Sequence, residues 1–278
     1  MDDPDGPKII VTHKKPHLDE VVGAWLLRAF DPDFTNCPFQ FISNTPTGGD
    51  MPAGQKFVGL GVGRGKYDEH GRQAGQSCTQ LVYQDLLHRG LIPNEQHEDK
   101  ALAWLVEYVH HEDTAHWLST DPQLTSFMPP SILRGLWLIH QDDQVLMDKG
   151  LEIIDALMAQ LNERARFDED WDKRVEFDSI WGKAVGVHST YRGSDIFAYH
   201  LGFQLRVQTD PTKPYGDFRV PAGSQIDLTP IYKKLIVLEP GAWYLHQTKK
   251  ILVSNSDSTV GLPGTKFNLQ QLIDFVKA

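Results

Sequence analysis

Histidine and acidic residues gather near the start of the chain, directly after an apolar run. In "IIVTHKKPHLDE" the side chains of His13, His17 and Asp19 fall within seven residues. Imidazole and carboxylate together suit Mn²⁺, Zn²⁺ or Fe²⁺ better than Mg²⁺, which prefers oxygen ligands. A plain polar loop is the competing interpretation, because Asp19 would also favour the positive end of a following helix and the chain holds 12 histidines.

Two further segments carry the same kinds of side chain. Asp68, Glu69 and His70 follow a glycine-rich loop, and "HHEDTAH" at 110–116 closes a predicted helix. A carboxylate at Asp113 is unfavourable at a helix C-terminus, because its charge repels the last carbonyl groups. Taken singly, each segment is also explained as a polar surface turn or helix end. Together, three such segments at strand and helix ends of one domain predict convergence on a metal site.

The elements that must position these residues alternate between strands and helices. The apolar patterns predict strands over 8–12, 39–43 and 56–62, and helices over 20–30, 77–90 and 99–113. Such alternation indicates an α/β fold with a parallel sheet, in which sites form outside the carboxyl ends of strands. Ser77 is the expected cap of the second helix.

Three regions follow from the change of pattern along the chain. The pattern of residues 1–130 predicts a metal-binding α/β domain, and that of residues 131–180 predicts a helical linker. Residues 181–278 are predicted to form a smaller α+β domain. Helical periodicity covers about 132–166, and the acidic stretch 167–178 is expected at the surface. The large aromatic residues of apolar segments are assigned to cores. They are Trp25, Trp104, Trp137 and Trp243.

Composition narrows the class of protein. The 278 residues are 40% hydrophobic and 23% charged, as in a soluble globular protein, and no apolar run approaches the ~20 residues that span a bilayer. We therefore expect no membrane partner. Two cysteines, Cys37 and Cys78, exclude a disulfide framework and favour the cytoplasm. The net charge of −10 argues against broad nucleic-acid binding and mildly favours small substrates.

The order of the segments resembles the exonuclease family named after the melanocyte proliferating gene, a relative of the DHH phosphoesterases, which use two Mn²⁺ ions. The pattern His13-x3-His17-x-Asp19-Glu20 resembles that family's first motif, and a similar pattern opens family II inorganic pyrophosphatases. "YDEHG" stands in the place of the family's Y-D-H-H. "LVEYVHHEDT" resembles a segment of the family that contains two aspartates. Asp113 stands at the position of the second aspartate, which implies that it binds metal.

The resemblance implies a DHH-like first domain that binds one or two Mn²⁺ ions. The implied metal ligands are His13, His17, Asp19, Asp68, Glu69 and Asp113. His70 is the implied catalytic residue, which contacts phosphate or protonates the leaving group. Lys14 and Arg192 are the candidate substrate contacts, with Lys249 and Lys250 as further candidates. Ordinary surface charge is the competing interpretation for all four.

Gly59 departs from the pattern, because the family has at this place the aspartate that bridges the two ions. Two functional hypotheses follow. The first is a phosphoesterase that hydrolyses phosphodiester bonds, as a 3′–5′ exonuclease on short RNA or DNA or as an enzyme for a phosphorylated small molecule. The second is a homologue without catalysis that binds a nucleotide, nucleic acid or protein. A structural module with incidental histidines is a third interpretation, and a homo-oligomer is compatible with each.

Overall fold

The chain divides into two compact units. The computed structural model describes residues 8–43, 51, 56–70, 75–92, 96–255, 261 and 263–278. The first unit is Met1–Asn162 and the second is Glu163–Ala278. The division falls within helix α6 (Asp143–Asp172), inside the segment for which the sequence predicts a helical linker. The chain is α/β, with a small parallel sheet in the first unit and a larger mixed sheet in the second.

The first unit is built on three parallel strands. They are β1 (Ile9–His13), β2 (Phe39–Ile42) and β3 (Phe57–Gly59), in the order β2-β1-β3. Ile10 pairs with Phe39 and Val58, so β1 is the central strand. Val11 packs with residues of the neighbouring segments into a small core on one face, which explains why an unbroken apolar run precedes His13.

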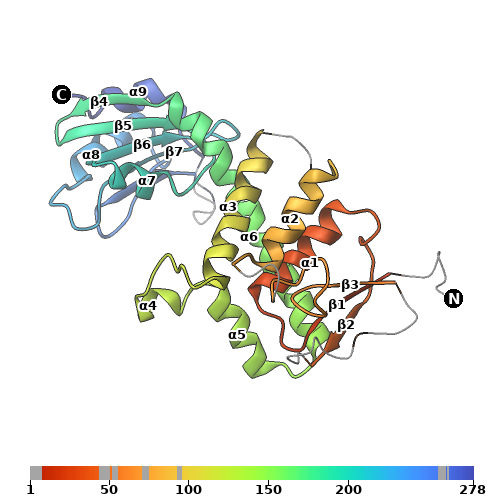
Figure 1. Ribbon diagram of the computed structural model, residues 1–278. Helices are drawn as coiled ribbons and strands as arrows, with labels where there is room; N and C mark the ends of the chain where they lie inside the picture. Colours follow the sequence, from red (N-terminus) through yellow and green to blue (C-terminus); the bar gives the residue numbers. More distant parts are fainter. Residues whose placement is uncertain are drawn as a thin grey trace. The chain divides into compact units, whose positions relative to one another are not determined.

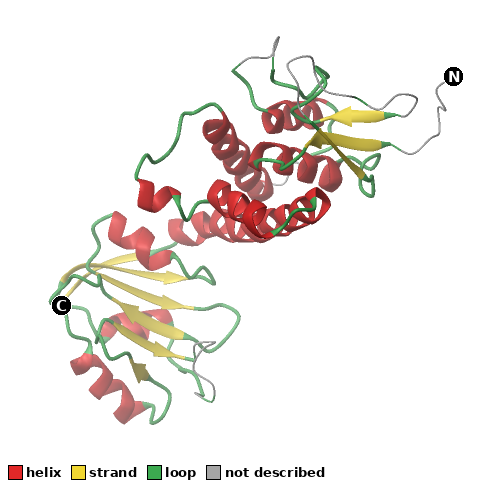
Figure 2. Cartoon of the chain, turned by 90° about the horizontal axis from the view of Figure 1, so that it is seen from below, coloured by secondary structure: helices red, strands yellow, loops and turns green. Residues whose placement is uncertain are grey.

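Helices cover this sheet and carry part of the site. They are α1 (Leu18–Phe30), α2 (Cys78–His88), α3 (Gln96–Asp113), the short α4 (Pro122–Thr125) and α5 (Pro129–Ile139). Helix α1 packs against α2, α3 and α5, and these helices lie to one side of the sheet (Figures 1 and 2). The Ser77 side chain accepts a hydrogen bond from the N–H of Gln80, which confirms the predicted cap of α2.

Strand β3 ends earlier than the sequence predicts. The expected strand 56–62 stops at Gly59, because Gly61 and Gly63 have φ values of +61° and +78° and turn the chain. A Cβ atom at position 61 would lie 2.6 Å from the Oε1 atom of Glu20. The glycine therefore lets the loop after β3 pass directly over the first turn of α1.

The second unit contains a six-stranded mixed sheet in the order β4-β5-β6-β7-β9-β8, in which β5 and β6 are parallel and the other pairs are antiparallel. The strands are β4 (Val175–Ser179), β5 (Gly182–His188), β6 (Leu205–Thr209), β7 (Gly216–Arg219), β8 (Tyr244–Leu245) and β9 (Ile251–Ser254). The helices are α7 (Ser194–His200), α8 (Thr229–Leu238) and α9 (Leu269–Asp274). This mixed topology agrees with the predicted α+β character of 181–278.

Alternating side chains of β5 join two cores in this unit. Ala184 packs with residues of α8 and α9, whereas Val185 packs with α7 and with Phe167 and Trp171 at the end of α6. The acidic residues of the predicted surface stretch 167–178 are exposed or half-buried, as expected, but not every residue of the stretch lies at the surface. Two of its three aromatic residues, Phe167 and Trp171, are buried, and its last residues begin β4.

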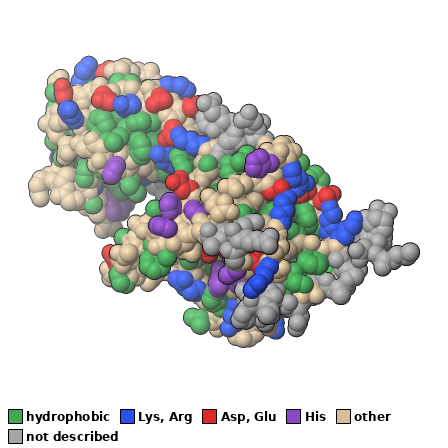
Figure 3. Space-filling model, in the orientation of Figure 1, with side chains coloured by type: hydrophobic (Ala, Val, Ile, Leu, Met, Phe, Trp, Pro, Cys, Tyr) green, Lys and Arg blue, Asp and Glu red, His purple; other side chains and the backbone are tan. Residues whose placement is uncertain are grey.

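Two further features are the apolar character of the described helices and the distribution of charges on one face of the molecule (Figure 3). No helix among the described residues combines the length and apolar character needed to cross a bilayer. On the face shown in Figure 3, acidic and basic side chains are scattered among polar and apolar ones.

Substitution of Gly59 by alanine should destabilise the first unit. A Cβ atom at this position would lie 2.6 Å from the carbonyl oxygen of Val62, so the main chain has to move. We expect Gly59→Ala to lower the free energy of unfolding by about 1–3 kcal/mol, as overpacking typically does. Gly65→Ala is the control, because nothing lies within 4 Å of its Cβ position. Equal denaturation midpoints for the two variants would contradict this account.

Candidate metal centre

Three segments that are far apart in the sequence bring carboxylates together in the first unit. Asp19 lies in the first turn of α1, Glu69 in the loop after β3, and Asp113 at the end of α3. One oxygen from each of these three residues lies within 4.8 Å of the others. We call this group the acid cluster. Two adjoining groups meet the same distance criterion: His13 with His17 and Glu20, and Asp68 with Glu69 and His70.

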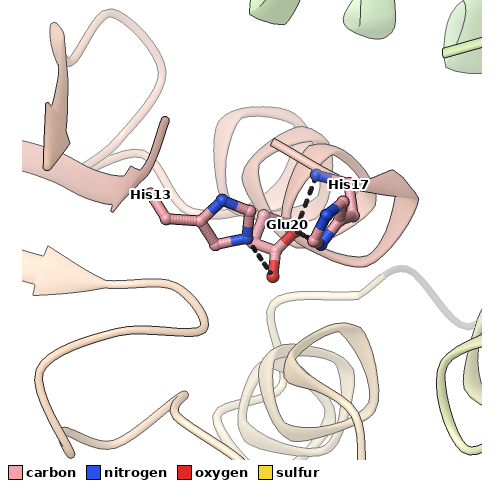
Figure 4. A group of neighbouring side chains, drawn as sticks. All are labelled: His13, His17 and Glu20. Atoms are coloured by element: carbon pink, nitrogen blue, oxygen red, sulfur yellow. Dashed lines mark hydrogen bonds and ion pairs between the residues drawn. The ribbon is translucent and has the colours of Figure 1, made fainter. Parts of the chain in front are cut away.

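His13 presents one ring nitrogen to Glu20 (Figure 4). Its Nδ1 donates a hydrogen bond of 2.8 Å to the carbonyl oxygen of Lys14, and its Nε2 lies 3.0 Å from Glu20 Oε1. Metal-binding histidines usually donate their second ring N–H in this way, because the bond fixes the tautomer and the ring orientation. The N–H of His17 donates to Glu20 Oε2 at 2.9 Å, so Glu20 also closes the first turn of α1.

His13 and Glu20 form a buried ion pair. Burial lowers the pKa of His13, but the hydrogen bond and charge of Glu20 outweigh it and raise that pKa to about 9. Burial raises the pKa of Glu20, but the hydrogen bond and charge of His13 lower it overall. A metal ion at Nε2 would therefore have to displace a proton from His13.

Asp19 is fixed by the start of α2. Its Oδ2 accepts a hydrogen bond of 2.7 Å from the N–H of Cys78, and its Oδ1 accepts one of 2.8 Å from the N–H of Thr79. A carboxylate at this position benefits from the positive end of the helix. Burial and the charges of Glu20 and Asp113 nevertheless raise the pKa of Asp19 well above its usual range. The two hydrogen bonds join α1 to α2 and hold this carboxylate in the cluster.

Glu69 carries an unsatisfied oxygen. Its side chain is 12% exposed, and its Oε1 lies 3.2 Å from His70 Nδ1. The buried Oε2 has no hydrogen-bond partner among the described residues. Burial, with added repulsion from Glu20 and Asp113, raises the pKa of Glu69 to about 7. Because a buried polar atom without a partner costs about 1–3 kcal/mol, this oxygen indicates a ligand site.

Asp68 shapes the loop that carries Glu69. One of its oxygens accepts from the N–H and from Nδ1 of His70, both at 2.9 Å, and the other accepts from the N–H of Arg64. The His70 side chain is 62% exposed. Partial burial lowers the pKa of His70, but the hydrogen bond to Asp68 and the charge of Glu69 raise it overall. Asp68 thus orients His70 as well as lying beside the acid cluster.

The predicted substrate contacts lie in different surroundings. Lys14 is exposed and directly follows His13. Arg192 belongs to the second unit, where its Nη2 lies 2.7 Å from Asp210 and its guanidinium stacks on a tyrosine ring. In the same unit Lys249 pairs with an aspartate, and Lys250 donates to two main-chain carbonyls. The structure therefore gives these three cations protein partners of their own.

A pocket of about 200 Å³ opens beside the acid cluster. Its wall includes Asp19 and Asp113, together with Arg134 and Trp137 of α5, which the sequence did not single out for binding. The assignment of Trp137 to a core is wrong, because its half-buried ring lines this pocket. The i, i+3 spacing of Arg134 and Trp137 on a predicted helix was the available signal, since it puts both on one face.

These features define the first unit as an α/β protein whose candidate metal centre of histidines and acids lies next to the end of its central strand. Residues 10–161 match the family model described as ChrB, C-terminal domain. The match covers more than half of the chain, so the chain belongs to this family. The matched residues are nearly those of the first unit.

The resemblance to the melanocyte-proliferating-gene exonucleases and the DHH phosphoesterases is therefore wrong, as is the DHH-like description of 1–130. Only the motif from His13 to Glu20 was specific, and it lies within the residues that the family model matches. The structure also has no space for a side chain at Gly59, where the resemblance required an aspartate.

Other comparisons add little. No curated protein is significantly similar in sequence to this chain. An uncharacterised protein from Helicobacter pylori G27 of known crystal structure is 11% identical, over 96% of this chain and 97% of that one, with a TM-score of 0.27. At this TM-score the likeness supports no conclusion about the fold.

The substitution Asp113→Asn should weaken metal binding without lowering the stability of the fold. The substitution removes one charge from the acid cluster, where partial burial and Glu20 raise the pKa of Asp113. We expect the metal-free variant to unfold at the same or a higher temperature at pH 7, while Mn²⁺ binding weakens at least about tenfold. Glu107→Gln, an exposed acid on the same helix, is the control. A clear loss of stability in Asp113→Asn would show that this carboxylate is structural.

Proposed function

We propose that the first unit is a metal-dependent hydrolase of phosphoesters that uses one or two Mn²⁺ ions at the acid cluster and its adjoining histidines. The observation that carries the proposal is the unsatisfied Oε2 of Glu69 among the carboxylates of Asp19 and Asp113. Carboxylate and imidazole ligands together favour Mn²⁺ over Mg²⁺. A bound cation would also neutralise acids that otherwise repel one another.

Glu69 is the best candidate for a shared ligand. It belongs both to the group with Asp19 and Asp113 and to the group with Asp68 and His70. Two ions ~3.5–4 Å apart need a shared anionic ligand to reduce their repulsion. Glu69 is therefore the residue that would bridge a second ion if two bind, and His13 would add an imidazole through Nε2.

The reaction would be the transfer of a phosphoryl group to water. A bound ion would lower the pKa of a water molecule towards neutrality, and the water oxygen would form a new bond to phosphorus. The bond from phosphorus to the ester oxygen would break, and that oxygen would take a proton. His70 can supply this proton, because Asp68 holds its ring and keeps its pKa raised.

The setting and the substrate class follow from charge and cysteine chemistry. Cys37 and Cys78 are both free and buried, which supports a reducing compartment such as the cytoplasm. The net charge of −10 and the small pocket support a phosphorylated small molecule over a long nucleic acid, with a short RNA or DNA end as the alternative substrate.

Purified protein should hydrolyse bis-p-nitrophenyl phosphate when Mn²⁺ is added. We expect Glu69→Gln to lose most of this activity and to bind Mn²⁺ at least about tenfold more weakly, because an amide cannot supply the charge of the carboxylate. Glu152→Gln, an exposed acid of α6, is the matched control. Release of nitrophenol is followed by absorbance and Mn²⁺ binding by electron paramagnetic resonance. Metal binding without turnover would instead identify a metal-dependent binding protein.

Mn²⁺ binding should release protons and strengthen as the pH rises. With a pKa of about 9, His13 is protonated at pH 7 and must lose that proton, and Glu69, with a pKa of about 7, is partly protonated. The affinity should therefore increase from pH 6 to about pH 9 and then level off. Calorimetric titration in two buffers of different ionisation enthalpy measures the released protons. Identical heats in both buffers would exclude His13 as a ligand.

A further inference from the structure

The pocket beside the acid cluster is lined partly by residues that do not belong to the candidate metal centre. Its lining comes from three elements: the start of α1, the end of α3 with the loop that follows, and α5. On the α1 side it reaches His17 and Asp19, so a ligand in the pocket would touch the metal centre directly. On the α5 side it reaches Arg134 and Trp137.

Arg134 is placed to bind an anion. Its Nη2 donates a hydrogen bond of 2.9 Å to the Oγ of Ser131, which orients the guanidinium along α5. It makes no ion pair with any residue that the structure describes, although its charge acts on His17 and Glu112. A guanidinium presents five donors in a planar fork that matches the oxygens of a phosphate.

Trp137 offers a flat apolar face in the same pocket. Its ring centroid lies 5.3 Å from that of His17, at an interplanar angle of 49°. The half-exposed ring of Trp117 lines the pocket as well. Indole rings stack on planar groups of many kinds, so these rings favour a ligand with a ring of its own.

Size and charge restrict the ligand further. Pockets for drug-sized molecules usually have about 300–1,000 Å³, so a pocket of about 200 Å³ suits a small compound. Arg134 in the wall attracts anions. Asp19, Glu112 and Asp113 repel them, so anion binding should require the metal ion as well as Arg134.

Resting on the proposed function, we infer that this pocket binds a small phosphoester that carries a planar ring. Arg134 binds the phosphate together with the metal ion, and Trp137 stacks on the ring. Arg134 and Trp137 thus determine which phosphoesters reach the metal centre.

Two phosphonates test this assignment without turnover, because their carbon–phosphorus bond resists hydrolysis. Phenylphosphonate carries a ring and methylphosphonate does not. In the presence of Mn²⁺ we expect phenylphosphonate to bind about tenfold more tightly by calorimetry, as expected for one stacking contact. Trp137→Leu should remove this difference, and Arg134→Gln should weaken both ligands at least about tenfold. Arg166→Gln, an exposed arginine of α6 outside the pocket, should change neither.

Mn²⁺ binding, measured separately by electron paramagnetic resonance, distinguishes the two proposals. If the wild-type protein and Arg134→Gln bind Mn²⁺ equally but also bind phenylphosphonate equally, the substrate assignment fails and the metal centre stands. If the wild-type protein does not bind Mn²⁺, the proposed function fails. A short single-stranded DNA that competes more strongly than phenylphosphonate would overturn the assignment to small substrates. Thermal unfolding of Arg134→Gln shows whether the variant is folded. Arg134→Lys should bind both phosphonates more tightly than Arg134→Gln, because lysine keeps the positive charge.

Discussion

Repulsion among buried carboxylates is the constraint on which the first unit depends. Asp19, Glu20 and Glu69 lie within a small volume that water reaches poorly, with Asp113 at its edge. Two like charges ~4 Å apart repel by about 4 kcal/mol at an effective dielectric constant of ~20. In the absence of metal, a proton on His13 neutralises Glu20, the start of α2 stabilises Asp19, and the pKa of Glu69 rises to about 7. A divalent ion bound among these carboxylates would reduce the same repulsion.

The surrounding fold keeps these groups in place through few contacts. The hydrogen bonds that Asp19 accepts from the first residues of α2 join two helices at the cluster, so this acid has a structural role. The positive φ of Gly61 lets the loop after β3 approach Glu20 and carry Glu69 across it. Asp68 then closes that loop by accepting hydrogen bonds from the main chain of Arg64 and from His70. These hydrogen bonds fix the positions of Asp19 and of the loop that carries Glu69.

Local patterns allowed much of this arrangement to be predicted. The apolar run before His13 and the periodicity after Asp19 predicted β1 and α1, because both signals depend on neighbouring residues only. The pairing of Glu20 with His13 was not predicted, because it depends on the conformation of the turn between β1 and α1. Arg134 and Trp137 were missed because only the packing of α5 beside α1 and α3 makes them part of a pocket. The family resemblance was wrong because it depended on one short motif, from His13 to Glu20, whereas the family match extends over residues 10–161.

The location of a bound ion tests the central claim most directly. Anomalous scattering from a crystal soaked in Mn²⁺ would place each ion without reference to activity. The account predicts a peak within ~2.0–2.6 Å of the Oε2 atom of Glu69, with further ligand atoms from Asp19 and Asp113. Absence of a peak in the acid cluster at saturating Mn²⁺, or peaks only at surface acids elsewhere, would contradict it.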